Sequence, residues 1–104
     1  MDSSVVFVGM NGRAFCLDRV NGELVWEAKL KGTDYVTLLL DGDLLFAATR
    51  GVVFCLQAAT GNLVWQNDMP GQGLGLASIA TAAGASNPGP AEEERRRQTT
   101  AATG

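Results

Sequence analysis

The sequence predicts an all-β protein built from two copies of one small sheet unit. The first observation is a repeat, because Cys16–Trp26 returns as Cys55–Trp65, 39 residues later. The second is that short apolar runs alternate with turn residues roughly every eight to twelve positions, which is typical of all-β folds. A fixed period of this length indicates a repeat architecture, whose units stack because one unit cannot bury its own apolar faces.

The similarity between the two copies extends beyond this core. When Val5–Gly32 is aligned without a gap on Leu44–Gly71, 10 of 28 positions are identical: Phe7, Gly12, Phe15, Cys16, Leu17, Gly22, Leu24, Val25, Trp26 and Gly32. The identical positions fall in apolar runs and in turns alike. We therefore expect the same strands and turns in both copies.

Three strands are expected in the first unit. Val5–Met10 is rich in β-branched residues, and the Asn11-Gly12 pair after it strongly favours a hairpin. The chain then returns as Arg13–Asp18, turns at Asn21-Gly22 and continues as Glu23–Leu30.

The second unit has a fuller pattern, with four expected strands that we letter A to D: Val36–Leu40, Leu44–Thr49, Val52–Gln57 and Asn62–Met69. They are joined by turns at Asp41-Gly42, Arg50-Gly51 and Thr60-Gly61 and form an antiparallel meander. The first unit supplies B, C and D and lacks its own strand A. Leu74–Thr81 falls where the next strand A is due, although its Gly and Ala content favours a strand only weakly.

Several expected strands are apolar at consecutive positions, as in Leu38–Leu40 and Val52–Phe54. Strict alternation would indicate a sheet with one face in water, whereas continuous apolar runs indicate sheets covered on both faces. Four-stranded sheets stacked in series and covered on both faces are the blades of a β-propeller.

Length and composition set the domain organisation. The chain has 104 residues, enough for one small domain. It is rich in Val, Leu, Phe and Trp up to about Gly84 and has no large apolar side chain after it. We expect two blades over residues 1–83 and a disordered polar tail over residues 84–104, because such a segment cannot offset the entropy lost on ordering.

The net charge of −3 argues against nucleic-acid binding, which needs a basic surface. No apolar run approaches the roughly 18 residues of a membrane span. Met1–Ser4 lacks the basic start of a signal peptide, and no apolar segment with a cleavage site follows it. The sequence as printed therefore predicts a cytoplasmic protein, with a periplasmic origin if it is a fragment of a longer chain.

Few residues offer catalytic or metal-binding chemistry. The chain has two Cys and no His, so a thiol nucleophile would lack its usual base and a zinc site would be incomplete. We interpret Cys16 and Cys55 as small buried apolar residues with free thiols. A disulfide is the alternative if the sheets bring their Cα atoms within about 7 Å. No cofactor and no metal are expected.

The repeat resembles that of the PQQ-like, or quinoprotein-type, β-propellers, whose motif is Ala-x-Asp-x-x-x-Gly-x-x-x-Trp. The resemblance covers about Val5–Gly71. The motif positions hold Cys16, Asp18, Gly22 and Trp26 in the first copy and Cys55, Gln57, Gly61 and Trp65 in the second. Both copies depart from the motif at the Cys, and the second also departs at Gln57.

The resemblance implies structural roles for Asp18, Gly22, Trp26, Gly61 and Trp65. Each Trp docks onto the neighbouring blade, and each Gly forms the tight turn between strands C and D. The residues themselves fit these roles. Burying about 200 Å² of indole contributes up to about 5 kcal/mol before entropic costs, Gly adopts positive φ without strain, and Asp18 can accept hydrogen bonds from the turn backbone.

The quinone-dependent enzymes that the repeat resembles also carry a vicinal Cys pair, calcium-binding acids and a catalytic Asp. This sequence has no vicinal Cys pair. We therefore expect a non-catalytic module for protein binding or scaffolding, with Asn11-Gly12, Thr33–Tyr35 and Asp41–Asp43 as surface loops. The alternative is a fragment or subunit of a quinone-dependent dehydrogenase-like propeller enzyme.

Two blades cannot close a ring, and stacking only two leaves outer apolar faces uncovered. One expectation is a homo-oligomer, a head-to-tail ring in which Leu74–Thr81 of one copy completes the first unit of the next. A second is that further propeller blades flank this chain in a longer protein. A third is a compact monomer of two sheets.

Overall fold

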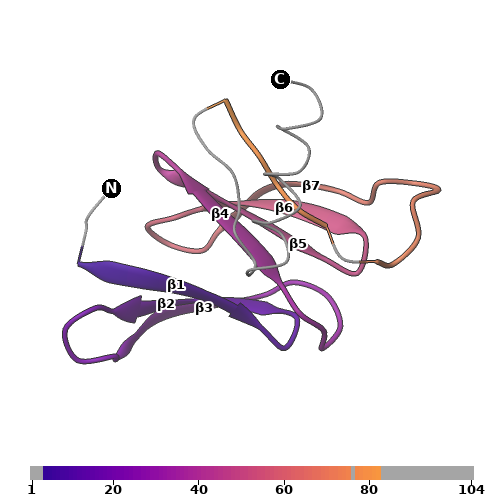
Figure 1. The fold of residues 1–104 in the computed structure, drawn as a ribbon. Coiled ribbons are helices and arrows are strands. Elements are labelled where there is room, and N and C mark those ends of the chain that lie inside the picture. Colours follow the sequence, from indigo (N-terminus) through magenta and orange to yellow (C-terminus); the bar gives the residue numbers. More distant parts are fainter. Residues whose placement is uncertain (1–3, 76, 83–104) are drawn as a thin grey trace, which may run out of the picture.

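The computed structural model describes residues 4–75 and 77–82, and its described part forms two antiparallel sheets (Figure 1). One sheet has the strand order β1-β2-β3 and the other the order β4-β5-β6-β7, so each is a meander of sequential neighbours. The strands are β1 (Val5–Met10), β2 (Arg13–Asp18), β3 (Leu24–Lys29), β4 (Thr37–Asp41), β5 (Leu44–Thr49), β6 (Val52–Gln57) and β7 (Leu63–Asn67).

The all-β prediction is confirmed, with strands B to D in the first sheet and A to D in the second. The predicted bounds of β1, β2, β5 and β6 agree with the structure, and those of the other three strands differ by one or two residues at their ends. Within the described residues β1 pairs with β2 on one side and has no strand on the other, so the first sheet lacks strand A.

The expected strand at Leu74–Thr81 does not form a regular strand in the described part of this segment. Only Ala80 makes an isolated bridge, and residue 76 lies outside the described residues. Its small side chains provide little packing, and residues 4–75 and 77–82 contain no strand B of a third unit to pair with it. The polar tail predicted at residues 84–104 also lies outside the described residues.

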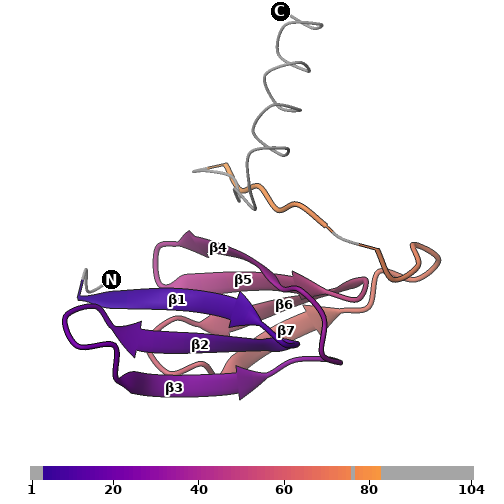
Figure 2. The ribbon, with the colours of Figure 1, turned by 60° about the horizontal axis from the view of Figure 1, so that its bottom comes forward.

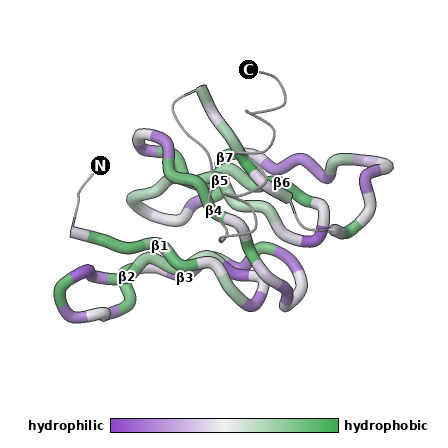
Figure 3. Tube along the Cα trace, in the orientation of Figure 1, coloured by the Kyte–Doolittle hydropathy of each residue, from purple (hydrophilic) through white to green (hydrophobic). Residues whose placement is uncertain are grey.

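The two sheets face each other (Figures 1 and 2). The hydrophobic core lies between them, and both sheets contribute apolar side chains to it. Apolar residues follow the strands, and hydrophilic residues concentrate in the connecting loops (Figure 3). The buried members of this core are Ala14, Cys16, Trp26, Val36, Leu45, Ala47, Val52, Phe54, Leu56 and Ala58. Alternate residues of β2, β5 and β6 therefore form much of the contact between the sheets.

The backbones of the two sheets come close where β4 and the residue before it pass β1. A Cβ atom built on Gly9 would lie 2.8 Å from the carbonyl oxygen of Val36 and 3.0 Å from the Leu38 side chain. Any larger residue at Gly9 would push β4 away, because a backbone carbonyl cannot move aside cheaply. The small residue in β1 therefore sets the distance between the sheets at this end.

Both sheets carry a β-bulge at equivalent positions. The β2–β3 register shifts between Cys16 and Leu17, and the β6–β7 register shifts between Cys55 and Leu56. A bulge re-aims the side chains next to it and increases the local twist. The two copies of the sequence repeat therefore share the position of a β-bulge as well as the order of their strands.

Among the described residues no helix is present that is long and apolar enough to cross a membrane.

Candidate interaction surface

The contact between the two sheets centres on the indole of Trp26, which lies on β3. Its Nε1 donates a hydrogen bond of 2.9 Å to the carbonyl oxygen of Ala58, in the turn after β6. The Trp26 side chain is only 9% exposed. An indole buries a large apolar surface and needs a partner for its N–H, and the turn between strands C and D of the second sheet satisfies both needs.

Gly61 makes room for this indole. A Cβ atom at Gly61 would lie 2.5 Å from Cε3 of Trp26, well inside van der Waals contact. Gly61 also has a φ of +78°, a conformation in which side chains other than Gly are strained. Two independent constraints therefore favour Gly at this position, one from the turn and one from the neighbouring sheet.

The turn itself is held by a compact set of hydrogen bonds. The Gly61 amide donates to the Gln57 carbonyl at 2.7 Å, and the Gln57 amide donates to the Asn62 carbonyl at 2.8 Å. The Gln57 side chain accepts from the Thr60 hydroxyl at 3.1 Å. The carbonyl of Ala58 is thus presented to Trp26 by a turn whose geometry is already fixed.

The first sheet has the same turn, with Asp18 as its side-chain acceptor. Asp18 Oδ1 accepts from the Val20 amide at 2.8 Å, and the Asp18 carbonyl accepts from the Gly22 amide at 2.8 Å. Gly22 has a φ of +76°. A Cβ atom at Gly22 would meet no heavy atom within 4 Å, so this turn has open space where the Gly61 turn holds an indole.

Trp65 is the counterpart of Trp26 in the second sheet, and its side chain is 45% exposed. It pairs with Cys55 across β6 and β7 and packs on Phe46, with ring centroids 6.1 Å apart. The structure therefore joins Trp26 with Gly61 and Asp18 with Gly22, and it leaves Trp65 on the outer face of the second sheet.

The acceptor of the inter-sheet hydrogen bond could not be predicted from the sequence. Ala58 is buried and uses its backbone carbonyl, which any residue type could provide. The corresponding position in the first copy is Arg19. The only indication in the sequence is that Ala58 lies three residues before the motif glycine Gly61. This spacing indicates an acceptor only when the docked position of the Trp26 indole is known.

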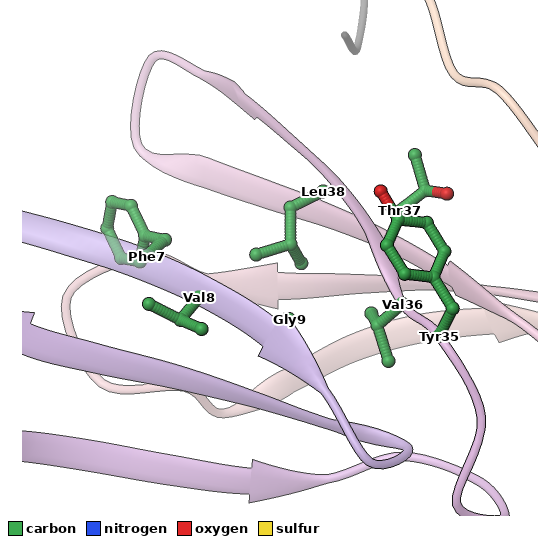
Figure 4. Close-up of a pocket in the computed structure, with 7 residues that line it drawn as sticks. All are labelled: Phe7, Val8, Gly9, Tyr35, Val36, Thr37 and Leu38. Carbon is green, nitrogen blue, oxygen red and sulfur yellow. The ribbon is translucent and has the colours of Figure 1, made fainter. Parts of the chain in front are cut away.

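A groove of about 320 Å³ lies beside the uncovered edge of β1 (Figure 4). Phe7–Gly9 line it from β1, and Tyr35–Leu38 line it from β4 and the loop before it. This lining carries no acidic or basic side chain, so the groove offers apolar contact and backbone hydrogen bonding rather than acid–base chemistry.

The three surface loops predicted from the sequence do not form one surface. Asn11-Gly12 and Thr33–Tyr35 lie together, because the Gly12 amide donates to the Asp34 carbonyl at 2.8 Å, and Arg50 forms an ion pair with Asp34 at 2.7 Å. Asp41–Asp43 lies at the other end of the strands, where the Asp43 carbonyl accepts from Ala58. Successive turns of a meander alternate between ends, which explains the separation.

Cys16 and Cys55 are both buried and both free. Burial raises the pKa of each thiol above its ordinary value of 9.0, because the apolar surroundings disfavour the thiolate. Over residues 4–75 and 77–82, no group of three or more His, Cys, Asp or Glu is arranged to hold a metal ion. The contact between the two sheets is built from apolar side chains and turn backbone.

Two stacked antiparallel meanders, with a Trp of one docked on the C–D turn of the next, define the chain as β-propeller blades. A family model for the outer membrane protein assembly factor BamB matches residues 1–89. The chain belongs to this family, which confirms the predicted resemblance to PQQ-like β-propellers.

A solved structure gives the same result. The crystal structure of BamB from Moraxella catarrhalis matches with 29% sequence identity and a TM-score of 0.53, over 62% of this chain and 20% of that one. The match therefore spans about one fifth of the length of that protein. None of the curated proteins matches the sequence.

Proposed function

We propose that this chain is a non-catalytic β-propeller module that works by binding or scaffolding proteins. One observation carries the proposal: both outer sheet faces present apolar side chains to solvent, including Val6 on β1 and Trp65 on β7. Apolar surface of this kind on a stack of sheets is typical of protein contact sites. Family membership supports the proposal, since the matched family is described as an assembly factor.

Quinone-dependent dehydrogenation is the competing function, and a direct titration separates the two. We expect no stoichiometric absorbance change and no thermal shift when the full chain is mixed with pyrroloquinoline quinone and Ca²⁺. A saturable shift at one equivalent of quinone would contradict the non-catalytic proposal.

The place of action is part of the proposal. The matched family is described as an outer membrane protein assembly factor, and this supports a periplasmic role in which the module contacts other proteins at that membrane. The cytoplasm is the alternative location. Fractionation of cells that express the full-length gene product, tagged at its C-terminus, distinguishes the two compartments.

The module would also associate with copies of itself, as a head-to-tail ring of about three or four chains. In Figure 1 residues 77–82 lie on the side of the second sheet that faces away from the first sheet. This order is the one expected if residues 77–82 lead into the position of a third blade. In the ring, this segment would supply the strand that β1 lacks. Light scattering coupled to size-exclusion chromatography tests the ring, and a stable monomer at high micromolar concentration would exclude it.

A further inference from the structure

We propose that Asn21 is a site of spontaneous deamidation, in which the backbone nitrogen of Gly22 attacks the side-chain amide of Asn21. The sequence contains two Asn-Gly pairs, Asn11-Gly12 and Asn21-Gly22. Such pairs favour this reaction, because Gly has no side chain to shield its backbone nitrogen. The structure distinguishes the two pairs, and its geometry points to Asn21 as the reactive one.

The reaction replaces the side-chain amide by a carboxylate. The Gly22 nitrogen gives up its proton to base and bonds to Cγ of Asn21, and the side-chain nitrogen leaves as ammonia with a proton from solvent. The product of this step is a cyclic succinimide. One water molecule then opens the ring at either carbonyl, which leaves aspartate or isoaspartate at position 21. The conversion thus consumes one water, releases one ammonia and adds one negative charge.

The side chain of Asn21 is held in a conformation that favours the attack. Its Oδ1 accepts a hydrogen bond of 2.9 Å from the Glu23 amide, two residues ahead. This Asx-type turn folds the side chain over the intervening peptide, so Cγ lies on the side of the Gly22 nitrogen. The Glu23 N–H also faces the oxygen on which negative charge develops, and a donor in this position stabilises such an oxyanion.

The backbone around Gly22 resists the reaction little. The Gly22 amide donates to the Asp18 carbonyl at 2.8 Å, and this bond has to open before the nitrogen can attack. A Cβ atom built on Gly22 would meet no heavy atom within 4 Å, and Val20 in the same turn is 89% exposed. A local opening of the turn therefore breaks the bond to Asp18 without displacing a packed neighbour.

The equivalent turn of the second sheet shows that this position stays exposed when a neighbouring sheet covers the turn. Gly61 lies against Trp26, yet Thr60, the counterpart of Asn21, is exposed. Thr60 Oγ1 accepts a hydrogen bond of 3.2 Å from the Asn62 amide, in the role that Asn21 Oδ1 has in the first sheet. Thr therefore provides the same hydrogen bond without an amide group that can be lost.

The Asn11-Gly12 pair is closed to the reaction. Gly12 is buried, its amide donates to the Asp34 carbonyl at 2.8 Å, and its carbonyl accepts from the Leu30 amide at 2.9 Å. A Cβ atom at Gly12 would overlap the carbonyl oxygen of Gly32. To free the Gly12 nitrogen, this turn has to separate from the loop packed against it, which breaks several hydrogen bonds together.

Deamidation would alter the turn from which β3 begins. Isoaspartate carries the main chain through its side chain, which adds one methylene to the turn backbone and disturbs the bond from Gly22 to Asp18. Either product places a carboxylate close to Asp18 and Glu23, where like charges repel. The modification therefore weakens the start of the strand that carries Trp26.

Peptide mapping of the aged full chain compares the two sites within one sample. The protein is incubated in mildly alkaline buffer, natively and in urea. Trypsin then releases Met1–Arg13 and Val20–Lys29, each of which contains a single Asn. Chromatography with mass spectrometry follows the fraction of aspartate and isoaspartate in each peptide.

In urea we expect similar rates for the two peptides, because both contain Asn-Gly. In the native protein Asn21 should slow by no more than about fivefold, the equivalent of one net hydrogen bond. Asn11 should slow by at least about thirtyfold, because several bonds have to open. A native reaction at Asn21 at least about fivefold faster than at Asn11 supports the proposal. A smaller ratio, or no reaction at Asn21, would overturn it.

Asn21→Thr is the matched variant, because Thr60 makes the same hydrogen bond in the second sheet. Circular dichroism checks that the variant is folded. Isoelectric focusing of the intact protein should show an acidic form that accumulates in wild type and not in Asn21→Thr. Equal accumulation in both proteins would place the deamidation at another residue and contradict the proposal.

Discussion

The pair of glycines at the two C–D turns allows the docking of Trp26 to be measured with an internal control. We consider Gly61→Ala and Gly22→Ala, each made in the full chain. Both glycines have nearly the same φ, +78° and +76°. The two substitutions therefore share the same backbone strain, about 1–2 kcal/mol for an L-residue in this region, partly offset by about 0.4–1 kcal/mol from a less flexible unfolded chain.

Only Gly61→Ala meets the indole. Its Cβ would lie 2.5 Å from Cε3 of Trp26, and the Cβ at Gly22 would meet nothing within 4 Å. Relieving this overlap requires movement of a ring that is hydrogen-bonded at its far side, and such overpacking costs about 1–3 kcal/mol. We therefore expect Gly61→Ala to lower the free energy of unfolding by about 1–3 kcal/mol more than Gly22→Ala does.

Urea unfolding followed by far-ultraviolet circular dichroism measures this difference. With a slope of about 1 kcal/mol/M for a small domain, the midpoint of Gly61→Ala should fall below that of Gly22→Ala by about 1 M or more. The measurement is made at a concentration at which sedimentation shows monomers, so that unfolding is not coupled to association. Equal midpoints for the two variants would refute the docking of Trp26 on the Gly61 turn.

Three further predictions concern single side chains. Trp26→Phe keeps an aromatic ring but leaves the Ala58 carbonyl without its donor, and we expect a loss of about 1–3 kcal/mol in urea unfolding; an unchanged midpoint would contradict the hydrogen bond. Asp18→Ala should cost about 1 kcal/mol by removing the acceptor of the turn, whereas no cost would show that water replaces it. Burial raises the pKa of the thiols of Cys16 and Cys55, so above about pH 9 the native state keeps protons that the unfolded state releases. The free energy of unfolding should therefore fall as pH rises through this range. This fall should vanish in a double Cys→Ala variant.

The strands and their order could be predicted from the sequence because repeat period and turn chemistry act locally. Asn11-Gly12 and Arg50-Gly51 fix the hairpins between strands B and C, and the bounds of the strands on either side agree with the structure. The strands β3 and β7, whose ends were predicted less accurately, pair across a β-bulge and do not follow a two-residue hairpin. Their ends are set by where pairing stops rather than by a turn residue.

The environments of the two motif tryptophans could not be predicted in this way. Trp26 and Trp65 stand at identical positions of two similar copies, yet one is buried and the other half exposed. The difference arises from position in the stack, since Trp26 has a sheet beyond it and Trp65 has none among the described residues. Likewise, the role of Ala58 rests on a backbone carbonyl, which side-chain identity does not reveal.

The weak strand expected at Leu74–Thr81 illustrates the limit of pattern alone. The spacing predicted a strand one period after Val36–Leu40, but the described residues of this segment make only the bridge at Ala80. A strand needs a partner edge as well as a suitable sequence.

The central claim is that the two sheets stack through the docked indole of Trp26. Proton exchange at the two indole N–H groups, followed by nuclear magnetic resonance of the wild-type protein, tests this claim most directly. A Trp65→Phe variant serves only to assign the two signals. At low concentration we predict slow exchange for the Trp26 N–H, which is bonded to Ala58 at 2.9 Å, and fast exchange for Trp65. Fast exchange at Trp26, or equal exchange of the two signals, would contradict the stacking of blades through a docked tryptophan.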